Sequence, residues 1–210
     1  MSSVFNQANV SFLLQGMKLT LIIAFLSIIL SVFLGTILAV LRNHSKGIFG
    51  KVATIYIEIF RNTPNLLWIL AIRFLVPIKP MNSGILSFTL FTSAAMAEIF
   101  RGGMNSIGKG QYEAAYSQGF SKFQTLRYII LPQSFRRCVP TFLSQAITVI
   151  KDTSFLWAVG IEEFTGKGMI LMGSFVSSFQ IFLLFGTIAA TYFIVNFAIS
   201  CCVRTIRTEY

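Results

Sequence analysis

The chain has 210 residues, of which 55% are hydrophobic and only 11% are charged, a composition too apolar for an ordinary soluble domain. Its formal net charge is +10, yet no basic run alternates with stacking aromatic residues on a polar surface, which argues against nucleic acid as a partner. We therefore interpret the chain as an integral membrane protein whose Lys and Arg residues gather in the loops on one side of the bilayer.

The first predicted helix covers residues 12–41. Residues 19–41 within it carry no charge over 23 positions, and a helix of that length extends about 34 Å, enough to cross a hydrocarbon core of roughly 30 Å. A cleaved signal peptide has a shorter apolar stretch behind a basic segment, whereas nothing basic precedes Lys18 here and Arg42 follows directly. We expect the segment to remain in the protein as a membrane span.

Hydropathy predicts four further spans, at residues 52–76, 83–100, 134–150 and 177–203. The second span is interrupted by Glu58, Arg61 and Pro64, and a turn or short interfacial piece near Gly173 and Ser177 precedes the last span. No linker or repeat of fixed period is visible in the sequence. The predicted fold is an all-α integral membrane protein with about five transmembrane helices, in one domain over residues 1–210.

The charged residues orient these spans. Basic residues gather in the loops at 42–51 and 101–127 and in the C-terminal tail, whereas the other loops hold few of them or mix them with acids. The positive-inside rule places both basic loops and the C-terminus in the cytoplasm. Five spans then place the N-terminus outside.

Residues 103–110 come close to a phosphate-binding loop. The Ser or Thr that would hold magnesium is replaced by Gly110, and such a loop follows a strand rather than a membrane span. We therefore expect no ATPase site on the chain itself. The single histidine, His44, lacks Cys or carboxylate companions, and the three cysteines form no recognisable framework, so we expect no metal, no cofactor and no catalytic residue.

Residues 111–120 are predicted to form a short polar helix between the third and fourth spans. Ala114, Ala115 and Gly119 lie on or near one of its faces, where small residues let another surface approach the backbone, and Glu113 can cap or pair with a basic group. An amphipathic helix lying at the membrane surface has the same spacing. The spacing leaves both interpretations open.

Four motifs in the same order resemble the permease subunits of type I ABC importers, in the branch that handles polar amino acids. The first is Glu113-Ala114-Ala115, three residues, Gly119, nine residues and then Ile-x-Leu-Pro ending at Pro132, the pattern of the EAA loop. The others are AEIFRGG at 97–103, FRNTP at 60–64 and KDTS at 151–154. The family-like core runs over about residues 16–207, with the coupling loop at about 102–132.

The resemblance implies an ATP-driven importer in the bacterial cytoplasmic (inner) membrane. Its expected partners are a separate ATP-binding ABC subunit, an extracytoplasmic substrate-binding protein and a second permease subunit, which is a copy or a relative. Glutamate, aspartate and glutamine are the expected substrates, and basic amino acids such as arginine or histidine are the alternative. A stand-alone secondary carrier is the alternative from a different class, but five spans are few for one.

Charges inside membrane spans are candidates for function. Pro64 disfavours helix at Thr63, so the second span should break there, and a half-helix beginning at Pro64 points its free amides at a substrate carboxylate. The alternative is a packing kink in which Arg61 pairs with Glu58 or Glu98.

Arg73 lies in an otherwise apolar stretch toward the outer end of the second span. If it faces the pore, it can pair with a side-chain carboxylate and favour aspartate or glutamate. The alternative is a side chain that extends to the outer interface.

The fourth span ends in a polar stretch that begins at Lys151. Asp152 is a candidate acceptor for the ammonium group of any amino acid, with Thr153 and Ser154 supplying hydroxyls, and an Asp152–Lys151 ion pair is the alternative. We expect Glu162 and Glu163, in the outer loop, to contact the binding protein.

Overall fold

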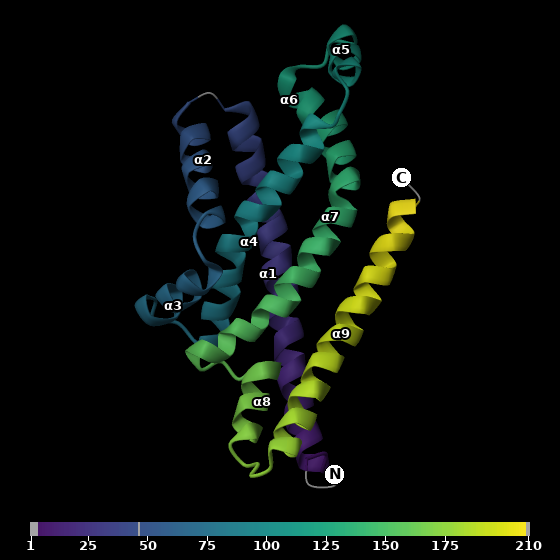
Figure 1. The fold of residues 1–210 in the computed structure, drawn as a ribbon. Helices are drawn as coiled ribbons and strands as arrows, with labels where there is room; N and C mark the ends of the chain where they lie inside the picture. Colours follow the sequence, from purple (N-terminus) through teal and green to yellow (C-terminus); the bar gives the residue numbers. More distant parts are fainter. Residues whose placement is uncertain (1–3, 46, 209–210) are drawn as a thin grey trace.

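The computed structural model describes residues 4–45 and 47–208, and this part of the chain is helical with no strand. Figure 1 shows long helices running side by side, with the N-terminus at one end of the molecule and α5 at the other. The long elements are α1 (Gln7–His44), α2 (Ile48–Arg61), α3 (Asn65–Leu75), α4 (Pro80–Asn105), α7 (Leu131–Asp152) and α9 (Ser178–Thr208). The short ones are α5 (Lys109–Ser117), α6 (Lys122–Gln124), the π-helical turn η1 (Thr125–Ile130), the 3-10 turn η2 (Thr153–Val159) and α8 (Phe164–Met172).

The five predicted spans correspond to α1, the α2–α3 pair, α4, α7 and α9. Within the described residues, α1, α4 and residues 178–205 of α9 are each long and apolar enough to cross a membrane. The α2–α3 pair consists of two shorter helices, and α7 has 22 residues, or about 33 Å of helix. Helix α5 and the N-terminus lie at opposite ends of the molecule, as the predicted topology requires. Which of the two ends faces the cytoplasm remains a prediction.

The centre of the fold is the contact between α1 and α4, which is made by small residues on α1. A Cβ on Gly35 would lie 2.7 Å from Cβ of Met96 and 2.8 Å from the Ser93 carbonyl, so only glycine fits there. The buried Ser31 hydroxyl donates to the Thr89 carbonyl at 3.2 Å. The contact between α1 and α4 therefore relies on close backbone approach and buried hydroxyls rather than on bulky side chains. In a membrane, an apolar side chain gains little by contacting protein instead of lipid.

The break between α2 and α3 is where the sequence predicts it. Helix α2 ends at Arg61, residues 62–64 are non-helical, and Pro64 is the N-cap of α3. Figure 1 shows α3 turning away from the axis of α2. The chain then returns through α4. The break between α2 and α3 therefore lies beside α4, between the two ends of the molecule.

The predicted turn before the last span is present at residues 173–177, and a short helix that was not predicted, α8, precedes it. It ends at Met172, and the turn that includes Gly173 leads to α9. Buried residues of α1, α8 and α9, including Leu13, Phe164 and Leu184, form one hydrophobic cluster at the N-terminal end of the molecule. That cluster holds α8 between the two longest helices.

Candidate functional site: the coupling loop and the charged break

The coupling loop, residues 102–132, forms the tip of the molecule that lies farthest from the N-terminus (Figure 1). Its helix α5 has Ala115 only 2% exposed, whereas Glu113 and Ala114 are exposed. The two alanines therefore differ in exposure, although the sequence suggests that they lie on or near one shared face. Tyr112 packs against the hydrophobic cluster beneath, and burial raises the pKa of its phenol, which keeps this anchor neutral.

Gly119 ends α5 in a left-handed conformation with φ of +82°. Its amide donates to the Tyr116 carbonyl at 3.0 Å, and the Phe120 amide donates to the Ala115 carbonyl at 3.1 Å. This pair of bonds is a Schellman motif, which ends a helix with a glycine in the left-handed conformation. Here the glycine is Gly119, four residues after Ala115, whose carbonyl accepts the bond from Phe120. A Cβ on Gly119 would have nothing within 4 Å, so the backbone conformation, rather than a lack of space, calls for glycine.

Two polar contacts tie the coupling loop to α7. The Gln133 Nε2 donates to Gln111 Oε1 at 3.1 Å, and Arg137 Nη1 donates to the Ser106 carbonyl at 2.6 Å. A capping box between Ser121 and Gln124 begins the segment that leads through η1 into α7. Side chains therefore link α5 and the segment before it to α7, in addition to the chain itself. Gln111 and Arg137 have no place in the motifs, and only the structure singles them out.

The hydroxyl of Thr63 is occupied within the break between α2 and α3. It donates to the Ile59 carbonyl at 2.8 Å and accepts from Trp68 Nε1 at 2.6 Å. These bonds close the last turn of α2 onto the first turn of α3 and fix the angle between the half-helices. Thr63 thus shapes the break, and Pro64 begins α3 without a side-chain cap.

Asp152, at the end of α7, lies beside the start of α3. The side chain of Asn65, the first residue of α3, lies beside its carboxylate. A fixed anion therefore faces the positive end of the half-helix. Next to it, the Thr153 hydroxyl is buried and donates to the Ile150 carbonyl at 2.7 Å, while Ser154 is half-buried. The structure thus brings FRNTP and KDTS together, and Asn65 is the contact that motif analysis missed.

Arg73 lies apart from this cluster. It is eight residues beyond Asn65 in the last turn of α3, or about 12 Å along the helix. The side chain is half-buried, and its Nε is buried with no hydrogen-bond partner. Among the described residues no carboxylate forms an ion pair with it, which leaves the guanidinium available to an anion.

Glu98 on α4 pairs with the charged residues beside the last turn of α2, next to the break. Its carboxylate pairs with Arg42 at 2.6 Å, with Arg101 at 2.9 Å and with Arg61 at 3.7 Å. Arg42 also pairs with Glu58 at 2.9 Å. Glu98 is thus the partner of Arg61, one of the two that the sequence left open, and the network joins α1, α2 and α4. Because the Arg61 side chain is still 45% exposed, its contact with Glu98 is the loosest of the three.

The expectation that Glu163 contacts a binding protein is wrong, because this residue is fully buried. Its carboxylate accepts hydrogen bonds from Thr20, from Tyr192 and from the amides of Thr165 and Gly166, at 2.8–3.1 Å. It caps α8 and ties that helix to α1 and α9. Glu162, with a side chain 59% exposed, is the one of the pair that faces outward.

Comparison with known proteins places this arrangement in a family. Residues 31–208 match the family described as "binding-protein-dependent transport system inner membrane component". The probable glutamine ABC transporter permease of Bacillus subtilis (strain 168) is 37% identical over 98% of this chain and 96% of its own length. The glutamate/aspartate import permease of Escherichia coli O157:H7 is 32% identical over 74% of this chain and 75% of its own length.

Solved structures agree. A chain from the crystal structure of an amino acid ABC transporter with histidines superimposes with a TM-score of 0.85 at 27% identity, covering 96% of this chain and 95% of that one. The MetNI methionine ABC transporter in an inward-facing conformation has the same fold, with a TM-score of 0.78 at 17% identity, covering 96% of this chain and 99% of that one. With these matches over nearly its whole length, the chain belongs to the family of binding-protein-dependent transport system inner membrane components.

Proposed function

We propose that the chain is the membrane-spanning subunit of an ATP-driven importer of a polar amino acid. The observation that supports this most is the exposed coupling loop, with the EAA pattern built around the Schellman turn at Gly119, in a chain of this family. Relatives named for glutamine and for glutamate and aspartate favour these amino acids over basic ones. The partners in this proposal are an ATP-binding subunit at α5, a second permease chain and a substrate-binding protein at the opposite end, in a bacterial cytoplasmic membrane.

The chain's own part is binding and coupling. Residues 103–110 form the end of α4, a turn and the start of α5, so they do not follow a strand as a phosphate-binding loop does. In the proposed cycle, ATP draws two ATPase subunits together, and each moves a docked α5. The ties from α5 and its flanks to α7 carry the movement to the end of α7, where Asp152 meets α3.

The proposed substrate site is the junction of α3 with the end of α7. Asp152 takes the ammonium group common to all amino acids, and the half-buried Ser154 adds a hydroxyl. The uncapped amides that follow Pro64 take the carboxylate. Thr63 and Thr153 shape this site from behind, because their hydroxyls already bond to their own backbone. Arg61 stands behind the same break, paired with Glu98.

Arg73 decides the class of side chain in this proposal. Glutamine and glutamate differ by a charge, so an unpaired guanidinium about 12 Å along α3 from Asn65 favours the acidic amino acid. If Arg73 instead extends to the outer interface, glutamine is the expected substrate.

The test is ATP-driven uptake of labelled glutamate by the complex reconstituted in vesicles with its ATP-binding subunit and binding protein. Aspartate, glutamine and arginine serve as competitors. Competition by aspartate would show that the substrates are acidic amino acids. Competition by glutamine alone would show that Arg73 does not contact the substrate. Uptake that continues without the ATP-binding subunit would overturn the proposed function as a whole.

A further inference from the structure

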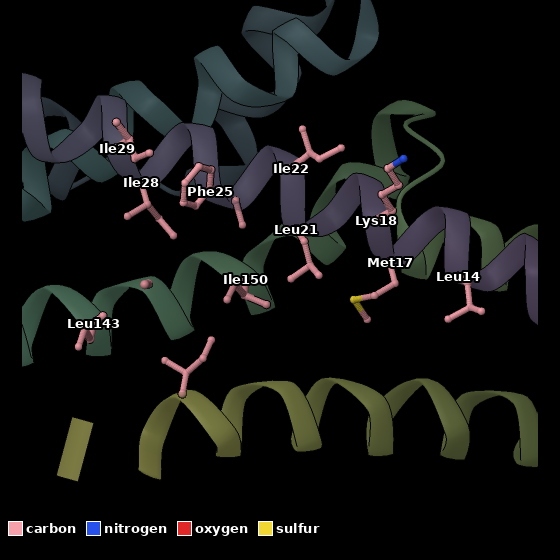
Figure 2. A pocket seen from close by; sticks show the side chains of 13 residues that line it. Leu14, Met17, Lys18, Leu21, Ile22, Phe25, Ile28, Ile29, Leu143 and Ile150 are labelled. Atoms are coloured by element: carbon pink, nitrogen blue, oxygen red, sulfur yellow. The ribbon is translucent and has the colours of Figure 1, made fainter. Parts of the chain in front are cut away.

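A groove runs along the membrane-facing side of α1, apart from the coupling loop and the charged break. Its volume is about 850 Å³. Figure 2 shows α1 as one wall and α7 behind it, with Leu143 and Ile150 on α7 and α9 along the opposite side. Leu21 and Met17 reach from α1 toward α9. The groove is therefore formed by three helices, each of which belongs to a different crossing of the chain.

The walls of the groove are apolar except at one place. Phe25 is 64% exposed and Ile29 is 50% exposed, so these large side chains meet whatever fills the groove. The one charged lining residue is Lys18, which is exposed and forms no ion pair with any described residue. In Figure 2 its nitrogen points away from α9, so the carbon stem borders the groove and the ammonium lies at the rim.

The part of the groove beyond Lys18 matches one leaflet of a bilayer. Lys18 immediately precedes the uncharged run of residues 19–41, at the border that we expect for the hydrocarbon core. From Lys18 to Ile29 there are 11 residues, or about 16 Å of helix, and half of a hydrocarbon core is about 15 Å. The lining on α1 also includes Leu14, one turn before Lys18, so the groove extends from the headgroup region to near the middle of the bilayer.

We propose that this groove is a binding site for one phospholipid, with an acyl chain along α1 and the headgroup phosphate on the ammonium of Lys18. An acyl chain offers only carbon to the walls, as the lining requires, and the phosphate supplies the anion that Lys18 lacks. Helix interfaces in membranes are instead rich in small residues and polar groups. The exposed walls here are Leu, Ile and Phe, which favours a lipid over a second copy of the chain.

The experiment is native mass spectrometry of the purified complex, with titration of phosphatidylglycerol and phosphatidylcholine after delipidation. Lys18→Gln removes the charge, and Leu21→Trp fills the groove from an exposed position without disturbing the core. Lys79→Gln is the matched control, because Lys79 is an exposed lysine at the start of α4, outside the groove.

We expect one tightly held phospholipid per permease chain in the wild type and in Lys79→Gln. Lys18→Gln should weaken phosphatidylglycerol binding at least fivefold and phosphatidylcholine binding less, while Leu21→Trp should weaken both. Equal lipid retention in all four proteins would overturn the proposal. So would dissociation of the two permease chains by Leu21→Trp, because the groove would then be the interface between chains. The test requires only that the chain spans a membrane, so its failure leaves the transport proposal standing.

Discussion

The coupling loop, residues 102–132, and the charged break, residues 62–64 together with the adjoining end of α7, differ in what their polar groups bond to. In the coupling loop, Glu113 and Ala114 face outward, and the backbone around Gly119 is closed by its own hydrogen bonds. At the break and at the adjoining end of α7, the hydroxyls of Thr63 and Thr153 donate to backbone carbonyls, and Asp152 lies beside Asn65. A docking surface can leave its side chains in water at no cost, whereas polar groups at membrane depth need partners before a ligand arrives.

From the same difference we expect the two regions to respond differently to mutation. The coupling loop depends on backbone shape, so a single Cβ should disturb it. The break depends on a network of bonds, so its changes should appear in substrate affinity. The predictions below separate these two behaviours.

The largest effect is expected for Gly119→Asp. The left-handed backbone disfavours any side chain by about 1 kcal/mol, and the new carboxylate intrudes on the surface that docks the ATP-binding subunit. We expect the complex to reach the membrane but to lose substrate-stimulated ATPase activity. Gly47→Asp is the control, since Gly47 lies outside the coupling loop, is exposed, has an ordinary φ of −93° and leaves room for a Cβ. Normal stimulation in Gly119→Asp would remove Gly119 from the coupling surface.

Asp152→Asn tests the break through substrate affinity. A hydrogen bond to a charged group contributes roughly 1.5–3 kcal/mol, so loss of the carboxylate should raise the KM for uptake about 10- to 100-fold. Because every amino acid has the ammonium group, glutamate and glutamine should be affected alike. Lys151→Gln, which changes the exposed neighbour, is the control and should leave KM nearly unchanged. An unchanged KM in Asp152→Asn would move the ammonium site elsewhere.

Arg73→Ala should discriminate between substrates where Asp152→Asn does not. Removing a half-buried guanidinium that faces an acidic side chain should weaken glutamate and aspartate uptake about tenfold and leave glutamine uptake nearly unchanged. Competition assays on reconstituted vesicles measure both values in one preparation. If uptake of all substrates falls by the same factor, Arg73 has a structural role and does not determine specificity.

The sequence predicted the five crossings, the break at Pro64 and the helix before Gly119, because each depends on local patterns: uncharged runs, a missing amide and small residues at fixed spacing. Apart from the Arg61–Glu98 pair, which it offered as one of two alternatives, it did not predict contacts between distant segments. The contact of Asn65 with Asp152, the pair of Arg42 with Glu98 and the enclosure of Glu163 all join residues far apart in the chain. Local sequence patterns do not indicate such contacts. An acidic residue in a loop is therefore predicted to be exposed, even when, like Glu163, it is enclosed by three helices.

The smallest expected effect concerns the tie between α5 and α7. A single neutral hydrogen bond contributes about 0.5–1.5 kcal/mol, so Gln111→Ala or Gln133→Ala alone should lower substrate-stimulated ATPase activity only a few-fold. If the bond carries the movement of α5, the double variant should be no worse than either single one, because the second change has nothing left to remove. Gln118→Ala combined with Gln133→Ala is the control, since Gln118 is exposed at the end of α5 and should act independently. Additive losses for Gln111 and Gln133 would mean that the two residues act independently of their shared bond, and no loss in either variant would leave the connection through η1 to carry the movement.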